Sequence, residues 1–216
     1  MAADIAQLLP LQLELADQLR MGRETMREPQ DLPGPYGRVV AAIDRVLAAI
    51  DCEAVVSGGW AVWRHGFVGR VTQDVDIVLP ADKTSEFMRV AGVSGFQALK
   101  AQPGRWPKMV HKETAIDVDI LPEGERPGTT TRPAPTTIPH PSRMGASGSQ
   151  LRYADVAPLI EMKLAAGRIQ DEADVMRLIE ANPEEIEAIR RHLSGIHQDY
   201  VDHFDRLVVR AREETA

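Results

Sequence analysis

The chain has 216 residues, of which 44% are hydrophobic and 5% aromatic, so it can bury one substantial core, alone or with a helical appendage, but not two full independent domains. Its 25 basic and 32 acidic residues give a formal charge of −7, which excludes broad non-specific binding to polyanions but leaves room for a local basic site. The single cysteine, Cys52, excludes an internal disulfide and a thiolate metal cluster. No apolar run reaches the roughly 20 residues of a membrane span. We therefore expect a cytoplasmic protein.

The N-terminal part is predicted to be helical. Residues 1–34 form a helical lead-in that ends in a proline- and glycine-rich segment, and Pro10 is expected to limit how far the helix extends backwards. Apolar residues then recur at helical spacing over 39–50. Residues 53–57, with their Ala-Val-Val centre, indicate a short buried strand that leads directly into a pair of glycines.

The middle of the chain is predicted to alternate helix and strand. A short helix is expected from Trp60 to Gly66. Residues 74–79 alternate polar and apolar with a period of two, which predicts a strand that Pro80 closes. Asp82 fits the N-cap of the next helix. Further strands are predicted at Phe96–Leu99, Met109–Lys112 and Ile116–Leu121.

The last third of the chain changes character twice. Residues 122–150 are rich in proline, threonine, glycine and serine, and this composition predicts a long loop that buries little apolar surface. Residues 151–216 are predicted to be helical, with helices at 156–167 and 171–181 and two more after them. Between the lead-in and the loop, residues 35–121 are expected to form the α/β core.

Two carboxylates are forced together in the strand at 74–79. Side chains alternate along a strand, so Asp74 and Asp76 point to the same face. Like charges at that range repel unless a cation lies between them, and Mg²⁺ prefers carboxylate and phosphate oxygens. A third carboxylate from the later strand would complete the ion sites used in nucleotidyl transfer. Asp117 and Asp119 share one face there, and either fits.

The glycine pair ahead of the acidic strand is suited to phosphate. Gly58 and Gly59 let the backbone approach a phosphate closely, and the helix that follows presents free N–H groups and the positive end of its dipole. Alone, such a pair is more often a plain turn, and the aspartates downstream give it weight. Arg70 is placed to steady a phosphate, although a lone arginine in a turn is more often a surface charge.

Together these motifs resemble the nucleotidyltransferase superfamily, whose pattern is Gly-Gly or Gly-Ser, a spacer, and then Asp-x-Asp between apolar residues. The matching segments are Val-Ser-Gly-Gly-Trp-Ala-Val at 56–62 and Arg-Val-Thr-Gln-Asp-Val-Asp-Ile-Val at 70–78. Within the superfamily the chain looks most like bacterial nucleotidyltransferase proteins of abortive-infection and toxin–antitoxin systems. Their C-terminal signature of Lys, then Arg, then Asp-x-x-Asp is similar to residues 159–175.

The resemblance implies a nucleotidyltransferase fold, with a small mixed sheet flanked by helices and a C-terminal helical part. It implies that Asp74, Asp76 and Asp119 are the catalytic and metal-binding residues, and it favours Asp119 over Asp117 because Asp followed by Ile-Leu and a turn is the closer match. The residues implied to bind the nucleotide are Ser57, Gly58, Gly59, Arg70, Thr72 and Lys163.

The activity implied is the Mg²⁺-dependent transfer of a nucleoside monophosphate from a nucleoside triphosphate to an acceptor hydroxyl on a small molecule, a protein or RNA. A toxin–antitoxin or defence role would add an antitoxin-like partner protein. The alternative is a non-catalytic protein that keeps this fold and binds a nucleotide or a partner. A phosphohydrolase that uses the same ions on water is a weaker alternative.

Several of these residues also have plainer interpretations. The stem of Lys163 can pack while its ammonium group reaches water. Arg168, Asp171 and Asp174 fit ordinary charges on a helix surface, where Arg168 and Asp171 are spaced to form a weak ion pair, and structural pairing is the favoured interpretation of all three. Trp60 and Trp63 are expected in the core rather than stacked on a base.

Overall fold

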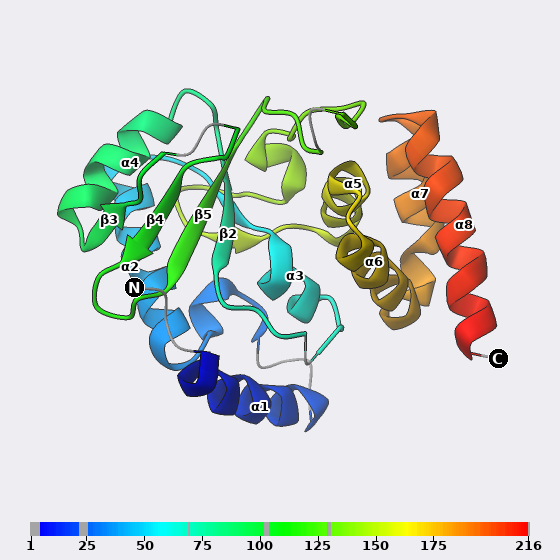
Figure 1. Ribbon diagram of the computed structural model, residues 1–216, viewed down its shortest axis with the longest axis horizontal. Coiled ribbons are helices and arrows are strands. Elements are labelled where there is room, and N and C mark those ends of the chain that lie inside the picture. Colours follow the sequence, from blue (N-terminus) through cyan, green and yellow to red (C-terminus); the bar gives the residue numbers. More distant parts are fainter. Residues whose placement is uncertain (1–4, 22–25, 69, 102–103, 129–130, 216) are drawn as a thin grey trace.

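The computed structural model describes residues 5–21, 26–68, 70–101, 104–128 and 131–215. The predicted α/β class is confirmed, because helices flank a sheet of parallel and antiparallel strands and a helical part follows it (Figure 1). None of the described helices is long and apolar enough to cross a membrane.

Six strands form one sheet in the order β3-β4-β5-β2-β1-β6. Their bounds are Val55–Val56 for β1, Val75–Leu79 for β2, Phe96–Ala98 for β3, Lys108–His111 for β4, Asp117–Pro122 for β5 and Arg152–Tyr153 for β6. β2 pairs parallel with β5 and antiparallel with β1. In the ladder between β2 and β5, Asp76 lies opposite Asp119. The two strands that carry the acidic residues are therefore neighbours in the centre of the sheet.

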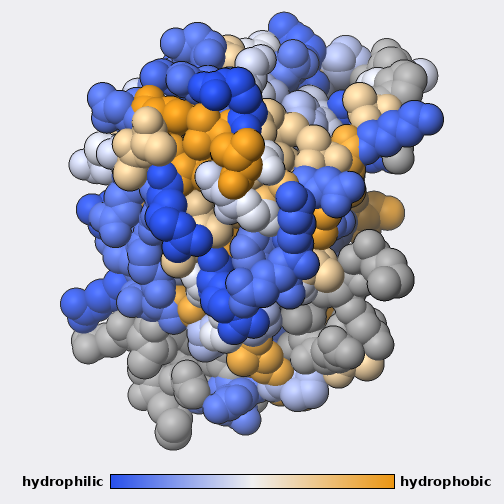
Figure 2. Space-filling model, turned by 90° about the vertical axis from the view of Figure 1, so that its left-hand side faces the viewer, coloured by the Kyte–Doolittle hydropathy of each residue, from blue (hydrophilic) through white to orange (hydrophobic). Residues whose placement is uncertain are grey.

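Two helices, α2 (Gly34–Ile50) and α4 (Thr84–Val93), lie behind the strands (Figure 1). Apolar residues of α2 recur every three or four positions, and this spacing places one side of the helix in the core. Cys52, which follows α2, is also buried. On the face seen from the β3 and α4 side, the largest apolar patch lies among hydrophilic side chains (Figure 2).

The short helix α3 (Gly58–Arg64) leads from β1 towards β2 on the side of the C-terminal helices (Figure 1). The predicted core positions of Trp60 and Trp63 are confirmed, since both side chains are buried. The ring of Tyr36 meets Trp60 edge-on, with ring centroids 4.5 Å apart. These aromatic side chains fix α3 against the core and so fix the turn at its beginning.

The C-terminal part packs four helices against one another, and the first of them contacts α3 (Figure 1). They are α5 (Val156–Ala166), α6 (Ile169–Ala181), α7 (Ile186–Ser194) and α8 (Gln198–Thr215). α5 lies inside this group, and every residue from Pro158 to Ala165 is buried. Its two charged residues are therefore buried as well, and Glu161 pairs with His192 of α7 at 2.7 Å. Burial on all sides explains why α5 has no polar face.

Residues 122–128 and 131–150 are more ordered than their composition predicts. Its backbone closes on itself, with Gly124 N–H donating to the carbonyl of Ile138 and Ile138 N–H donating to the carbonyl of Glu125. Pro141–Met144 form a 3-10 helix, and the side chains of Ala134, Ile138 and Met144 are buried. Composition underestimates this order because a few apolar side chains anchor the segment to the core and internal hydrogen bonds satisfy its backbone.

The first helix, α1, extends from Ile5 to Met21 and contains Pro10. The expectation that Pro10 limits the helix on its N-terminal side is wrong for this chain, since five helical residues precede it. A proline near the beginning of a helix removes only one backbone donor, and a helix that packs against the rest of the fold tolerates that loss. Gln12 of α1 is buried against the turn before β2 and links this helix to the candidate site.

Candidate active site

Three aspartates converge at one edge of the central strands. Asp74 immediately precedes β2, Asp76 lies within it, and Asp119 faces Asp76 from β5. One carboxylate oxygen from each residue lies within 4.8 Å of the other two, and all three residues are half-buried. The alternation along β2 and the parallel register with β5 together produce this arrangement.

The electrostatics of the three carboxylates are unfavourable without a cation. Burial, followed by the charges of Asp74 and Asp119, raises the pKa of Asp76 from 3.8 to about 7. Burial also raises the pKa of Asp119, against the opposing effect of Lys108. A bound divalent ion would remove this repulsion. The three carboxylates are therefore better suited to holding a hard cation than to lying together without one.

Asp119 belongs both to the acidic cluster and to an ion pair. The ammonium of Lys108 lies 2.9 Å from the buried Oδ1 of Asp119, and it also donates to Asp117 at 3.3 Å. Lys108 thus pairs with both aspartates of β5, whereas only Asp119 also joins Asp74 and Asp76. The donor set of three carboxylate oxygens suits Mg²⁺.

The raised pKa of Asp76 predicts a pH-dependent effect of metal. Because the pKa of Asp76 is higher in the folded state, this carboxyl group contributes to the free energy of unfolding. The contribution is fully present below the unfolded-state pKa of 3.8 and is lost as the pH rises through the folded-state pKa of about 7. We therefore expect saturating Mg²⁺, at about 100 times its dissociation constant, to raise the free energy of unfolding by roughly 3 kcal/mol at pH 8. At pH 5 Asp76 holds a proton that the metal must displace, and the stabilisation should shrink strongly. Urea unfolding at both pH values, with NaCl of equal ionic strength as control, measures this, and an equal effect at both would contradict it.

Gly58 brings the beginning of α3 into direct contact with the aspartates. Its φ is +59°, a conformation that side chains disfavour, and a Cβ built there would lie 1.7 Å from Oδ2 of Asp76. The backbone also joins the two segments, because Ser57 N–H donates to the carbonyl of Asp76 at 2.9 Å. Only glycine lets the turn approach the carboxylate this closely.

Gly59 is packed against two of the predicted nucleotide-binding residues. A Cβ at this position would lie 2.4 Å from Oγ1 of Thr72 and 2.6 Å from Nη1 of Arg70. The Thr72 hydroxyl in turn lies 3.5 Å from Oδ1 of Asp74. The structure thus brings Ser57, Gly58, Gly59, Arg70 and Thr72 together beside the three aspartates.

The segment that carries Thr72 is held by residues for which the sequence offered no functional signal. The carbonyl of Thr72 accepts hydrogen bonds from the Tyr36 hydroxyl, at 3.0 Å, and from the side-chain amide of Gln12. Oε1 of Gln12 also accepts from Thr72 N–H, at 3.3 Å. These contacts come from α1 and α2, so both helices position Thr72 in the turn that leads to the acidic strand.

Lys163 lies in a buried network of charges rather than on a helix surface. Its ammonium donates to Asp174 at 2.7 Å and to Asp171 at 3.2 Å. Asp174 also binds Arg70 at 2.8 Å, and Asp171 binds Arg168 at 2.6 Å. The expected structural pairing is confirmed, but the side chains of Asp171 and Asp174 are at most 1% exposed, so the expectation that they lie on the helix surface is wrong. The Lys163 side chain is 5% exposed, so its ammonium does not reach bulk water either.

This network places positive charge beside the acidic cluster. The charges of Lys163 and Arg168 both lower the pKa of Asp76, against the larger effects that raise it. Arg70 joins the network to the glycine turn, since it contacts both Gly59 and Asp174. The spacing of Asp171 and Asp174, one helical turn apart on α6, is the signal from which sequence reasoning could have inferred a shared partner.

Replacing Gly58 with alanine tests whether the close approach of the turn matters. The strained φ alone should cost about 1–2 kcal/mol of stability, and the new methyl group must displace the Asp76 carboxylate. We expect nucleotide transfer to fall by about a hundredfold or more, in line with a loss of preorganised charge stabilisation. Gly92→Ala in α4 is the matched control, because a Cβ there meets nothing within 4 Å. Equal activity of the two variants would contradict the role given to this turn.

A comparison with protein families matches the part of the chain that carries the aspartates. Residues 39–126, less than half of the chain, match the family model of aminoglycoside-2''-adenylyltransferase. The matched segment contains Asp74, Asp76, Asp119 and the glycine pair. A search of curated proteins gives no match.

Two solved structures resemble the chain weakly. One is the crystal structure of ANT(2'')-Ia in complex with adenylyl-2''-tobramycin, which is 13% identical over 83% of this chain and 98% of that one, with a TM-score of 0.43. The other is the solution structure of the antibiotic-resistance factor ANT(2'')-Ia, which is 17% identical over 82% of this chain and 93% of that one, with a TM-score of 0.39. The expected closeness to toxin–antitoxin proteins is not shown. The family match over the acidic strands indicates that the protein is a nucleotidyltransferase.

Proposed function

We propose that the protein uses Mg²⁺ to transfer a nucleoside monophosphate from a nucleoside triphosphate to a hydroxyl group of an acceptor. The observation that carries this proposal is the convergence of Asp74, Asp76 and Asp119 beside the Gly58-Gly59 turn. A site for a metal ion and a triphosphate needs carboxylates that hold the ion and a turn whose backbone can approach the phosphates closely. The three aspartates and the Gly58-Gly59 turn meet these two needs.

In this proposal the three aspartates hold the divalent ion, which when bound neutralises charge on the triphosphate. The acceptor oxygen attacks the α-phosphorus, a new P–O bond forms, and the bond to the β-phosphate oxygen breaks so that pyrophosphate leaves. Asp119 accepts the proton of the acceptor hydroxyl, and its raised pKa suits it to that role.

Arg70 and Lys163 have different parts in the proposal. Arg70 is 18% exposed and lies against Gly59, so it can contact a phosphate directly. The ammonium of Lys163 has three N–H donors, of which Asp171 and Asp174 engage two. Lys163 therefore stabilises the charge of the leaving pyrophosphate from within the network and can offer it a third donor.

The family match favours ATP as the triphosphate and a small molecule as the acceptor, rather than a protein or an RNA end. The supply of triphosphates places the reaction in the cytoplasm, which agrees with a single buried thiol. A toxin–antitoxin or defence role with an antitoxin-like partner gains no support from the match, and the proposal stands without it.

The experiment is incubation with ATP labelled at the α-phosphate, Mg²⁺ and either a panel of aminoglycosides or a cell extract. The sharpest comparison is Asp119→Asn against Asp117→Asn, since the two residues share a strand face and the ion pair with Lys108 but only Asp119 joins the cluster. We expect the first variant to lose transfer by about a hundredfold or more and the second to retain it. Calorimetric binding of ATP without any turnover would instead support the alternative of a non-catalytic nucleotide-binding protein.

A further inference from the structure

The turn at 70–73, which leads into β2, has no regular secondary structure and depends on side chains for its hydrogen bonds. At Thr72 side chains satisfy both backbone groups. The N–H donates to Oε1 of Gln12 at 3.3 Å, and the carbonyl accepts from the side-chain amide of Gln12 and, at 3.0 Å, from the Tyr36 hydroxyl. Burial raises the pKa of Tyr36 to about 12, so its hydroxyl keeps its proton and remains a donor. The amide of Gln12 thus pairs with Thr72 as a neighbouring strand would.

Gln12 lies on the side of α1 that faces the core. It is 3% exposed, whereas Glu14 of the same helix is exposed. A buried amide costs free energy unless its polar atoms have partners, and Thr72 and Tyr36 engage both N–H groups of this amide and its oxygen. Both α1 and Tyr36 lie outside residues 39–126, which match the family model. The contact therefore joins a helix outside the matched segment to the turn before the aspartates.

Thr72 passes this restraint on to Asp74. Its hydroxyl donates to Oδ1 of Asp74 at 3.5 Å. Asp74 precedes β2, and the ladder between β2 and β5 begins at Val75, so strand pairing does not fix the position of Asp74. Asp76 and Asp119, in contrast, lie opposite each other within that ladder. Of the three carboxylates, the one on Asp74 therefore depends most on the turn.

We propose that Gln12 and Tyr36 are positioning residues of the metal site, and that α1 is needed for its full metal affinity. They act through Thr72, which holds the carboxylate of Asp74 in the cluster. Residues that orient a metal ligand without touching the metal typically change metal affinity by roughly 10- to 100-fold when they are removed. This inference rests on the proposed function, because it takes Asp74 as a metal ligand.

The test measures the affinity for Mn²⁺, added alone to the nucleotide-free protein at pH 8, from the electron paramagnetic resonance signal of the free ion. Gln12→Leu removes the hydrogen bonds to Thr72 and Tyr36, and we expect it to weaken Mn²⁺ binding by about tenfold. Tyr36→Phe removes one donor to the Thr72 carbonyl and should weaken binding by about threefold. Urea unfolding shows whether each variant is folded, and Tyr36→Phe carries the test if Gln12→Leu does not fold.

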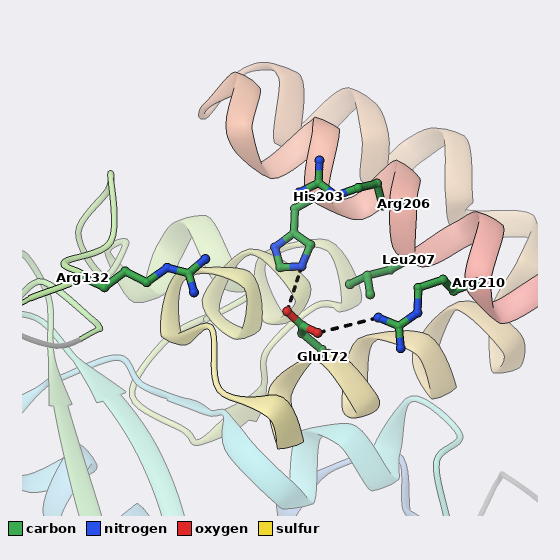
Figure 3. Close-up of a pocket in the computed structure, with 6 residues that line it drawn as sticks. All are labelled: Arg132, Glu172, His203, Arg206, Leu207 and Arg210. Carbon is green, nitrogen blue, oxygen red and sulfur yellow. Dashed lines mark ion pairs between the residues drawn. The ribbon is translucent and has the colours of Figure 1, made fainter.

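Two control variants leave the turn unchanged. Glu14→Leu alters an exposed residue of α1. Glu172→Gln removes a carboxylate that is turned towards α8, where it pairs with His203 at 3.1 Å and with Arg210 at 3.8 Å (Figure 3). Both controls should bind Mn²⁺ with the affinity of the unmodified protein.

The outcomes separate this inference from the proposed function. Folded Gln12→Leu and Tyr36→Phe variants that bind Mn²⁺ as tightly as the unmodified protein would overturn the inference alone, since the metal site would still be present. A loss of affinity in either control as large as that in Gln12→Leu would overturn it as well, because the effect would not be specific to the turn. Absence of Mn²⁺ binding to the unmodified protein would overturn the proposed function together with the inference.

Discussion

Asp76→Asn is expected to lower the rate of nucleotide transfer by about a thousandfold, equivalent to roughly 4 kcal/mol of transition-state stabilisation. Asp76 is the centre of the cluster, because it faces Asp119 across the ladder and touches the turn at Gly58. Asparagine keeps the size of the side chain but cannot supply the negative charge that a divalent ion needs. The measurement is transfer of label from ATP at saturating Mg²⁺.

The same substitution should make the metal-free protein more stable at pH 8. The pKa of Asp76 is raised to about 7, so its ionisation above that pH destabilises the folded state, and a neutral amide avoids this effect. Loss of activity together with a gain in stability separates a functional role from a folding defect. A variant that loses both, or that keeps full activity, would contradict the role given to Asp76.

Lys163→Met is expected to lower the free energy of unfolding by about 3–5 kcal/mol, the range measured when one partner of a buried ion pair is removed. The substitution leaves Asp171 and Asp174 buried, with Arg168 and Arg70 as their remaining cations. Methionine retains the packing of the stem, so the effect reports the lost charge. Urea unfolding at pH 7 measures it.

Two further variants sharpen this prediction. Lys112→Met removes an exposed lysine outside the network and should change stability by no more than about 0.5 kcal/mol. Adding Asp174→Asn to Lys163→Met removes one of the two buried charges left without the lysine, and it should recover part of the loss. A loss below about 1 kcal/mol in Lys163→Met, or no recovery in the double variant, would show that the network is not coupled in this way.

The local part of the site was accessible from the sequence. Alternation along a strand puts Asp74 and Asp76 on one face, and the glycine pair ahead of them marks a close approach. The choice between Asp117 and Asp119 needed the register of β5 against β2, which depends on strands far apart in the chain. Non-local pairing of this kind leaves no periodic trace in the sequence.

The supporting contacts were harder to infer. The spacing of Asp171 and Asp174 is equally suited to a helix surface, and only the packing of α6 against α5 turns them inward to Lys163. Gln12 and Tyr36 carry no motif, yet they hold the backbone of Thr72. The proline-rich segment was predicted as a plain loop because its few buried residues, such as Ile138, are diluted among polar ones.

The most direct test is a crystal structure with Mn²⁺ and a non-hydrolysable ATP analogue, in which anomalous scattering locates the metal. We expect a peak coordinated by the carboxylates of Asp74, Asp76 and Asp119, with the triphosphate against Gly58 and Gly59. A metal peak elsewhere in the molecule, or a triphosphate bound without any metal among the three aspartates, would contradict the account.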